Sequence, residues 1–256
     1  MTSKPSAYHI EEASFLEHWP SYGSPNEIED LRASPEFKRL DDNKHVYVDY
    51  TGGGLYAESQ LDKPKEYLAS NVYGNPHSIN PTSIASTERV ELARQKVLSF
   101  FNASPDEYAC IFTHNASGAL KLVGEAFPFD KKSQYILTAD NHNSVVGIRE
   151  YAKAKGAKVM YASMQGQEVQ IDNKDLVCKL KKARKSANNL FAFPAQSNFT
   201  GTQHSLELIE IARRRNHYVL VDFAAYAPTN KIDMSVWKPD FATFSFYKIF
   251  GYTQPG

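Results

Sequence analysis

The sequence predicts an α/β domain with a mostly parallel central sheet and helices on both faces of that sheet. Short runs rich in β-branched and aromatic residues alternate along the chain with longer runs that have helical spacing. The chain has 256 residues, of which 42% are apolar, and this is enough for one large core. Strands joined by helical crossovers pair in parallel, so the polar residues that follow them meet at one edge of the sheet.

The chain is predicted to divide into an N-terminal arm with short helices, residues 1–45, and a sheet-containing domain, residues 46–256. The arm is polar and is interrupted by prolines, and IEDLRA (28–33) is typical of a short helix. From residue 46 the pattern changes. VYVDY (46–50) predicts a first strand, which ends at the breaker cluster TGGG (51–54).

The elements that follow are predicted from the same two periodicities. The predicted strands are 108–113, 135–138, 158–162, 190–195, 218–222 and 241–245. The predicted helices are 90–101, 117–127, 145–156, 175–186 and 205–216. SPDE (104–107) has the residues of a capping box, with Ser104 at the N-cap and Glu107 three positions later. This regular alternation indicates successive crossover units.

The composition argues against several function classes. Lys plus Arg and Asp plus Glu both number 29, so no basic field of the kind that attracts nucleic acid is expected. The sequence has neither the apolar core of a secretory leader nor a run long enough to span a membrane. Cys110 and Cys178 lack a metal-type spacing and are too few for a disulfide framework. We therefore expect a cytoplasmic protein without a metal, membrane or nucleic-acid partner, which acts on a small molecule or binds a protein.

Polar residues cluster where the predicted strands end. FTHNASGA (112–119) opens a helix with small residues and the hydroxyl of Ser117, a pattern that favours an anion, although an ordinary helix cap has the same residues. His142 follows strand 135–138 and could stack on a planar ligand, move protons or simply cap a helix. Asn198 follows strand 190–195, where its amide suits either a polar ligand or a plain turn.

Two charged residues complete the set of strand-end side chains. Asp222 ends the apolar run VLVD, where a carboxylate is costly unless a protonated ring nitrogen or an arginine pairs with it. Lys248 lies within FSFYKIFG (244–251), whose apolar side chains favour the neutral, nucleophilic amine, although a surface lysine on an edge strand has the same pattern. Together the set fits pyridoxal 5'-phosphate (PLP), which needs a lysine, a carboxylate at the ring nitrogen, an anion site and a side chain stacked on its ring.

These segments resemble the class V PLP-dependent enzymes of the cysteine desulfurase type. They are most similar to the N-terminal, desulfurase-like domain of eukaryotic molybdenum cofactor sulfurases. The resemblance covers residues 28–256 and is carried by VYVDYTGGGLYAESQL, NVYGNPHS, IFTHNASGALKLVGEAFPF, HNSVVGIRE, NLFAFPAQSNFTG, VLVDFAAYAPTNKIDMS and FATFSFYKIFGY. It implies the large domain of a PLP-dependent transferase of fold type I, truncated before the small C-terminal domain.

The resemblance also implies a role for each candidate residue. Lys248 would carry PLP as the internal aldimine, and His142 would stack on the ring and serve in proton transfer. Asp222 would pair with the ring nitrogen, and Asn198 would lie near the ring face or the substrate carboxylate. The implied phosphate-binding residues are Ala116, Ser117 and Ser245. The implied substrate-side residues are Thr51, Gly52 and His77, with Gly53 in the same turn.

The sequence departs from simple desulfurases at several positions. Ala225 stands where simple desulfurases have a glutamine, and Tyr247 stands where they have a histidine; both are typical of the sulfurase branch. The turn DYTGGG replaces the more common DHAGAT. The family's persulfide cysteine and its carboxylate-binding arginine belong to segments that follow the region matched here. Neither Cys110 nor Cys178 is a good candidate for taking sulfur.

We therefore predict a PLP-dependent, molybdenum cofactor sulfurase-like enzyme that mobilises sulfur from L-cysteine through Lys248 and forms a homodimer. Two alternatives stay open at this point. One is a truncated PLP enzyme that acts as a lyase or transaminase on another amino acid or a biosynthetic intermediate. The other is a non-catalytic paralogue.

Overall fold

The computed structural model describes residues 7–22, 27–167 and 169–251. Contacts between residues divide the chain into two compact units. The first, here called the N-terminal unit, comprises residues 1–48 and 56–66, and the second, the sheet unit, comprises residues 49–55 and 67–256. Each unit is described separately below.

The N-terminal unit is helical. It contains α1 (Ala7–His18), α2 (Glu27–Ala33), a 3-10 turn η1 (Pro35–Phe37), α3 (Lys38–Asp42) and the beginning of α4 (Ser59–Ser70). The helix predicted at 28–33 is therefore confirmed as α2. The backbone N–H of Ser59 donates to the Glu36 carboxylate at 2.8 Å, and this hydrogen bond lowers the pKa of Glu36. The Arg39 guanidinium lies 4.2 Å from the centre of the Tyr56 ring, which adds a cation–π contact.

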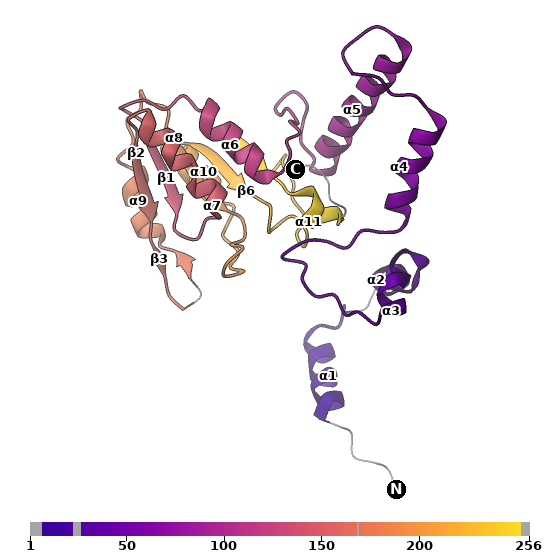
Figure 1. Ribbon diagram of the computed structural model, residues 1–256. Helices are drawn as coiled ribbons and strands as arrows, with labels where there is room; N and C mark the ends of the chain where they lie inside the picture. Colours follow the sequence, from indigo (N-terminus) through magenta and orange to yellow (C-terminus); the bar gives the residue numbers. More distant parts are fainter. Residues whose placement is uncertain (1–6, 23–26, 168, 252–256) are drawn as a thin grey trace. The chain divides into compact units, whose positions relative to one another are not determined.

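The sheet unit is built on a five-stranded parallel sheet with strand order β2-β1-β5-β6-β7, which confirms the predicted fold class. Figure 1 shows β1, β2 and β6 of this sheet with helices beside them. The strands are β1 (Gln134–Thr138), β2 (Lys158–Ala162), β5 (Leu190–Pro194), β6 (Tyr218–Asp222) and β7 (Phe241–Thr243). Each lies within a predicted strand or within one residue of it. Pro194, Asp222 and Thr243 are paired across the last row of β5, β6 and β7, so these strands end at the same level. A small hairpin, β3 (Met164–Gln165) and β4 (Gln170–Ile171), was not predicted.

Helices cover both faces of the sheet, because its strands are apolar on both sides. On one face, α6 (Ala116–Ala126), α7 (Asn143–Val146) and α8 (Ile148–Ala154) pack against residues such as Leu190 and Leu220. On the other, α9 (Asn173–Leu180) and α10 (Leu208–Arg213) pack against Phe191 and Val219. Burying each such large side chain contributes about 1.5–3 kcal/mol to the free energy of unfolding. This double cover explains why the strands of the sheet were predicted well.

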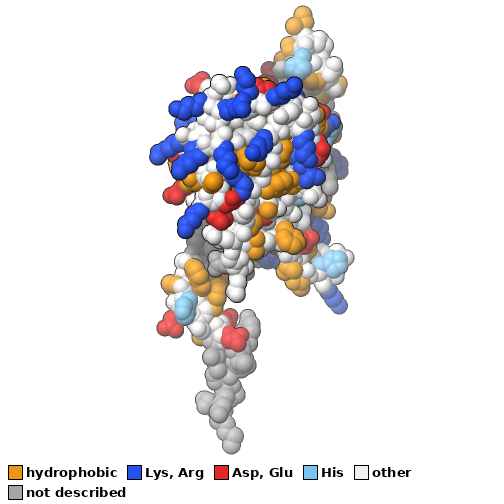
Figure 2. Space-filling model, turned by 90° about the vertical axis from the view of Figure 1, so that its left-hand side faces the viewer, with side chains coloured by type: hydrophobic (Ala, Val, Ile, Leu, Met, Phe, Trp, Pro, Cys, Tyr) orange, Lys and Arg blue, Asp and Glu red, His pale blue; other side chains and the backbone are white. Residues whose placement is uncertain are grey.

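The predicted helices exist, but their ends differ from the prediction. The helix predicted at 90–101 is the last part of α5 (Pro81–Phe100), which begins earlier because the Asn80 side chain accepts the Ser83 N–H at 3.0 Å. The helix predicted at 145–156 is split at Gly147 into α7 and α8. Helix α9 stops at Leu180 rather than at 186. The segment after α9 carries four exposed cations whose repulsion disfavours a further turn: Lys181, Lys182, Arg184 and Lys185. Figure 2 shows Lys and Arg side chains gathered on the face where β2 and α9 lie.

Two predicted strands are wrong. Residues 46–50 form no strand, and Val46 and Val48 are 89% and 81% exposed. Residues 108–113 are extended but form no strand either, and Ile111 is 62% exposed. A groove lined by residues 108–113 and 241–244 separates this segment from β7, and an extended segment without a neighbour to pair with does not become a strand.

The predicted capping box SPDE also opens no helix. It forms a turn in which the Tyr108 N–H donates to the Ser104 carbonyl oxygen at 2.9 Å, and the extended segment follows directly. In the described part of the chain, none of the helices combines the length and the hydrophobicity that crossing a membrane requires.

His217, at the amino end of β6, makes the stability of the fold depend on pH. It is 4% exposed, its Nε2 lies 2.9 Å from Nε2 of Gln134, and burial lowers its pKa to about 4. In the unfolded chain His217 binds a proton below about pH 6.5, whereas in the folded chain it binds one only near pH 4. As the pH is lowered across this window, the free energy of unfolding should therefore decrease by about 3 kcal/mol. Urea titrations of wild-type and His217→Gln between pH 4 and pH 7 test this, and an equal slope in the two proteins would contradict it.

Candidate functional site

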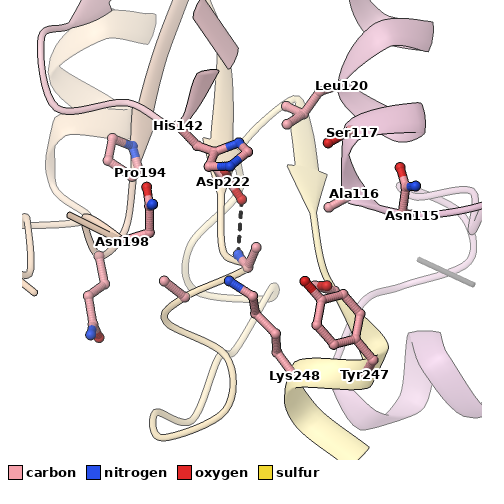
Figure 3. Close-up of a pocket in the computed structure, with 14 residues that line it drawn as sticks. Asn115, Ala116, Ser117, Leu120, His142, Pro194, Asn198, Asp222, Tyr247 and Lys248 are labelled. Carbon is pink, nitrogen blue, oxygen red and sulfur yellow. Dashed lines mark hydrogen bonds between the residues drawn. The ribbon is translucent and has the colours of Figure 1, made fainter. Parts of the chain in front are cut away.

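A cavity of about 240 Å³ lies where the carboxyl ends of β5 and β6 meet the beginnings of α6, α7 and α11 (Phe246–Phe250). It is lined by Asn115, Ala116, Ser117, Leu120, His142, Pro194, Gln196, Asn198, Asp222, Ala224, Ala225, Ser245, Tyr247 and Lys248 (Figure 3). All seven residues predicted to bind a cofactor are among them: Ala116, Ser117, His142, Asn198, Asp222, Ser245 and Lys248. The volume is slightly below the roughly 300–1,000 Å³ usual for ligand pockets, which suits a compact ligand.

One end of the cavity is the N-terminus of α6. The Asn115 side chain caps this helix by accepting the Gly118 N–H at 2.8 Å. Within the described residues, the N–H groups of Ala116 and Ser117 have no hydrogen-bond partner. Free N–H groups at the positive end of a helix dipole attract an anion. The hydroxyl of Ser117, which lies 2.5 Å from that of Ser144, is available beside them.

The buried carboxylate of Asp222 lies deeper in the cavity, at the end of β6. Its side chain accepts the Ala224 N–H at 3.0 Å and lies 3.5 Å from the Thr243 hydroxyl (Figure 3). The pKa of Asp222 is raised because burial disfavours its charged form, and this outweighs the Ala224 N–H and the charges of His142 and Lys248. In the described part of the chain no cation lies within ion-pair distance of it. The site thus holds a carboxylate that lacks a positively charged partner.

Lys248 and His142 reach the cavity from different elements. Lys248 lies on α11, and its amine is directed into the cavity in Figure 3, so it is not a surface lysine on an edge strand. No hydrogen bond or ion pair to the amine is found among the described residues. His142 is the N-cap of α7, and its Nδ1 accepts the Ser144 N–H at 3.2 Å. In the neutral ring the proton therefore lies on Nε2.

The backbone that carries Lys248 rests on Gly54. The Gly54 N–H donates to the Tyr247 carbonyl oxygen at 3.0 Å. A Cβ atom at Gly54 would lie 2.9 Å from the Lys248 carbonyl oxygen and 3.0 Å from the Gly251 nitrogen. The sequence identified the segment TGGG as a chain breaker but gave no sign of this contact.

The predicted substrate-side residues Thr51, Gly52 and His77 do not line the cavity. All three are exposed. Gly52 lies in a turn in which its N–H donates to the Asp49 side chain at 3.1 Å, and His77 donates its N–H to the Thr87 hydroxyl at 2.9 Å. Their role toward a substrate stays a prediction.

Several lining residues were not predicted. Asn115 could have been found, because asparagine before a run of small residues is a typical N-cap. Leu120, Pro194 and Ala224 carry no chemical signal in the sequence, and only the fold brings them to the cavity.

Neither cysteine lines the cavity. Cys110 is half-buried in the groove beside residues 241–244, and burial raises its pKa. Cys178 is exposed on α9. A reactive thiol needs a low pKa and access to the reaction site, so neither is placed to take sulfur from a ligand in the cavity.

Three comparisons extend these observations. The family model "Aminotransferase class-V" matches residues 46–253. Molybdenum cofactor sulfurases of Solanum lycopersicum and Oryza sativa subsp. japonica are 41% and 40% identical over 94% and 90% of this chain. The matched region is 33% and 31% of their own lengths, so the chain spans about a third of these relatives. The crystal structure of the cysteine desulfurase CsdA from Escherichia coli has a TM-score of 0.70 and 25% identity, and the match covers 86% of this chain and 55% of that one.

Proposed function

Because this chain belongs to the aminotransferase class-V family, we propose that its cavity binds PLP and that the protein is a PLP-dependent enzyme that mobilises sulfur from L-cysteine. The observation that carries the proposal is the meeting of Lys248, Asp222 and the N-terminus of α6 in one cavity. The names of the relatives, molybdenum cofactor sulfurase and cysteine desulfurase, support the substrate class.

The cavity residues fit PLP group by group. Among the described residues no cation lies within ion-pair distance of the buried Asp222 carboxylate, and a protonated ring nitrogen would supply one. The free N–H groups of Ala116 and Ser117, with the Ser245 hydroxyl, offer donors to a phosphate. The amine of Lys248, which has no partner among the described residues, would be available to hold the aldehyde carbon covalently. When bound, PLP supplies an electron sink for bonds at the amino-acid carbon.

The chain's own residues would then orient and protect the reacting groups. Asp222 would favour the protonated form of the ring nitrogen, because a buried carboxylate stabilises a nearby positive charge. His142 would lie against the ring and could hold or deliver a proton at Nε2, because its Nδ1 already accepts the Ser144 N–H. Asn198 offers an amide to the ring or to the substrate carboxylate. We further propose that Thr51, Gly52 and His77 act on the substrate side.

The proposed reaction breaks the carbon–sulfur bond of L-cysteine and forms a sulfur–sulfur bond to a thiol, which leaves alanine and a persulfide. We propose that the accepting thiol is neither Cys110 nor Cys178, since neither lines the cavity. We also propose a cytoplasmic homodimer without nucleic-acid partners, with an arm at residues 1–45 and a PLP-binding domain at 46–256. The equal numbers of acidic and basic residues support the absence of a nucleic-acid partner.

The proposal is tested by incubating the PLP-loaded chain with L-cysteine and dithiothreitol as the thiol acceptor, and by measuring alanine and sulfide. Both products are expected. A keto acid or ammonia formed from another amino acid, without alanine from cysteine, would instead favour a lyase or transaminase. Failure to bind PLP would favour a non-catalytic protein. Multi-angle light scattering of the same sample tests the dimer.

A substitution at Gly54 is expected to disturb the lysine from outside the cavity. The methyl group of Gly54→Ala would press on the backbone of Lys248 and Gly251, which cannot rotate away, and overpacking of this kind costs about 1–3 kcal/mol. We expect PLP affinity to fall about 10-fold, measured by titration of the cofactor absorption band. Gly53→Ala is the matched control, because its Cβ would lie at an ordinary 3.6 Å from the Tyr247 ring. Equal affinities in the two variants would contradict this role of Gly54.

A further inference from the structure

Outside the cavity lining, Asp140 and His204 form a buried pair. The Nε2 atom of His204 lies 2.6 Å from Oδ2 of Asp140, and the two side chains are only 1% and 3% exposed. Every other ion pair of the described residues has side chains at least 21% exposed. Neither residue lines the cavity, and neither has a part in the function proposed above.

Asp140 belongs to the loop that presents His142, here called the β1 loop (residues 139–142). The Thr138 hydroxyl donates to Oδ1 of Asp140 at 2.7 Å. The Asn141 side chain donates to the Thr138 carbonyl oxygen at 3.0 Å and to the Ala192 carbonyl oxygen on β5 at 3.2 Å. The base of this loop is therefore fixed to two strands. Asp140 can connect the loop to a further part of the chain through its remaining carboxylate oxygen, Oδ2.

His204 closes the loop that presents Gln196 and Asn198, here called the β5 loop (residues 195–204). Its backbone N–H donates to the Ala195 carbonyl oxygen at 2.9 Å, and Gln196 pairs with Gln203 in an antiparallel bridge. The Ser197 hydroxyl donates to the Asp140 carbonyl oxygen at 3.3 Å. Two hydrogen bonds, from His204 and Ser197, thus join the β5 loop to Asp140.

The hydrogen bond between His204 and Asp140 can fix the orientation of the two loops that carry these residues. The Nδ1 atom of His204 is buried and has no partner, so a charged ring would leave an N–H unpaired. With a proton on Nε2, the ring donates to Oδ2 of Asp140 at 2.6 Å. Burial alone would raise the pKa of Asp140, but the hydrogen bonds from His204 and Thr138 outweigh it and lower that pKa. An apolar pair would fill the same space without fixing an orientation.

We propose that Asp140 and His204 are positioning residues that lock the β1 loop to the β5 loop and thereby fix His142 and Asn198 at the cavity. The proposal rests on the proposed function in so far as the ligand is PLP. The phosphate end of the cavity, at the start of α6, belongs to neither loop. Loss of the pair should therefore loosen the ring end of the site and spare the phosphate end.

The first experiment measures three ligands on the full chain: PLP, pyridoxal, and inorganic phosphate as a competitor of PLP. In His204→Ala we expect the affinities for PLP and pyridoxal to fall about 10-fold or more, with the phosphate inhibition constant unchanged. His204→Gln should recover most of the affinity, because its amide can still donate to Asp140. The circular dichroism of the bound cofactor should change in His204→Ala, since the ring is held less firmly.

His217→Ala is the matched control, because it removes a second buried histidine at the opposite, amino end of the same sheet. It should lower the unfolding midpoint and leave all three affinities unchanged. If His204→Ala does not fold, Asp140→Asn carries the same test, since it keeps the volume of the pair and weakens its hydrogen bond. Equal losses for PLP and phosphate, or losses in His217→Ala as large as those in His204→Ala, would overturn the proposal.

A second measurement needs no cofactor and separates the failure of this proposal from the failure of the proposed function. Amide hydrogen exchange of the cofactor-free chain should quicken in both loops in His204→Ala, and not in His217→Ala. Unchanged exchange in the β1 loop would overturn the lock even if PLP binds. If the wild-type chain binds no PLP, the proposed function fails, and the exchange result alone decides whether the loops are joined.

Discussion

Replacing Lys248 by alanine is expected to abolish the long-wavelength absorption band that PLP gives on the wild-type chain. Lys248 is the only lysine among the residues that line the cavity, and its amine has no partner in the described part of the chain. Without it, no other amine in the cavity can hold the cofactor covalently. Alanine release from L-cysteine should fall by on the order of 10³-fold or more, because the covalent route is lost.

Two further variants separate the chemistry of Lys248 from its charge. Lys248→Arg keeps a basic side chain at this position but cannot form the covalent link, so it should bind PLP without the long-wavelength band. Lys238→Ala removes an exposed lysine whose Nζ lies 2.7 Å from Glu107, outside the cavity, and should behave as wild type. Borohydride reduction followed by peptide mapping should place the label on residues 246–251. A label on any other lysine, or a band that survives in Lys248→Ala, would sink the assignment.

Sequence reasoning found the inner strands of the sheet, which are buried on both faces, and also the more exposed edge strand β2. Residues 135–138 and 218–222 are continuous apolar runs, because helices cover both sides of the sheet, and their pattern is visible without knowledge of their neighbours. Residues 46–50 and 108–113 have the same local composition, yet neither becomes a strand. Whether an apolar run forms a strand depends on a pairing partner, and local pattern cannot show one.

The site was predicted as far as it follows from the order of strand ends. Parallel strands carry the residues after them to one edge, so His142, Asn198 and Asp222 were expected to meet, and they do. Gly54 and His204 were missed for a different reason. Gly54 is one of three consecutive glycines and His204 is an isolated histidine, so neither belongs to a sequence pattern that predicts a role. Their roles come from contacts that are made only in the folded chain.

Asp222 makes the cofactor-free and the cofactor-bound protein respond in opposite ways to one substitution. Without a ligand, the carboxylate is buried with no ion-pair partner among the described residues, so Asp222→Asn should raise the unfolding midpoint of the cofactor-free chain. With PLP bound, the same change removes the partner of the ring nitrogen. Losing one partner of a buried charge pair costs roughly 2–5 kcal/mol, so PLP affinity should fall by about 10²-fold. Thermal unfolding with and without PLP measures both effects.

The pH dependence of the unfolding free energy of the cofactor-free chain is an independent test of whether the Asp222 carboxylate destabilises the fold. The pKa of Asp222 is raised in the folded state, so the folded chain keeps its proton at a pH where the unfolded chain has lost it. The free energy of unfolding should therefore decrease as the pH rises from the pKa of Asp222 in the unfolded chain through its raised pKa in the folded chain. This decrease should vanish in Asp222→Asn. Identical pH profiles in the wild type and in Asp222→Asn would mean that the Asp222 carboxylate does not destabilise the folded chain. A stabilised variant that also loses PLP would instead show that the chain maintains a destabilising charge because the cofactor requires it.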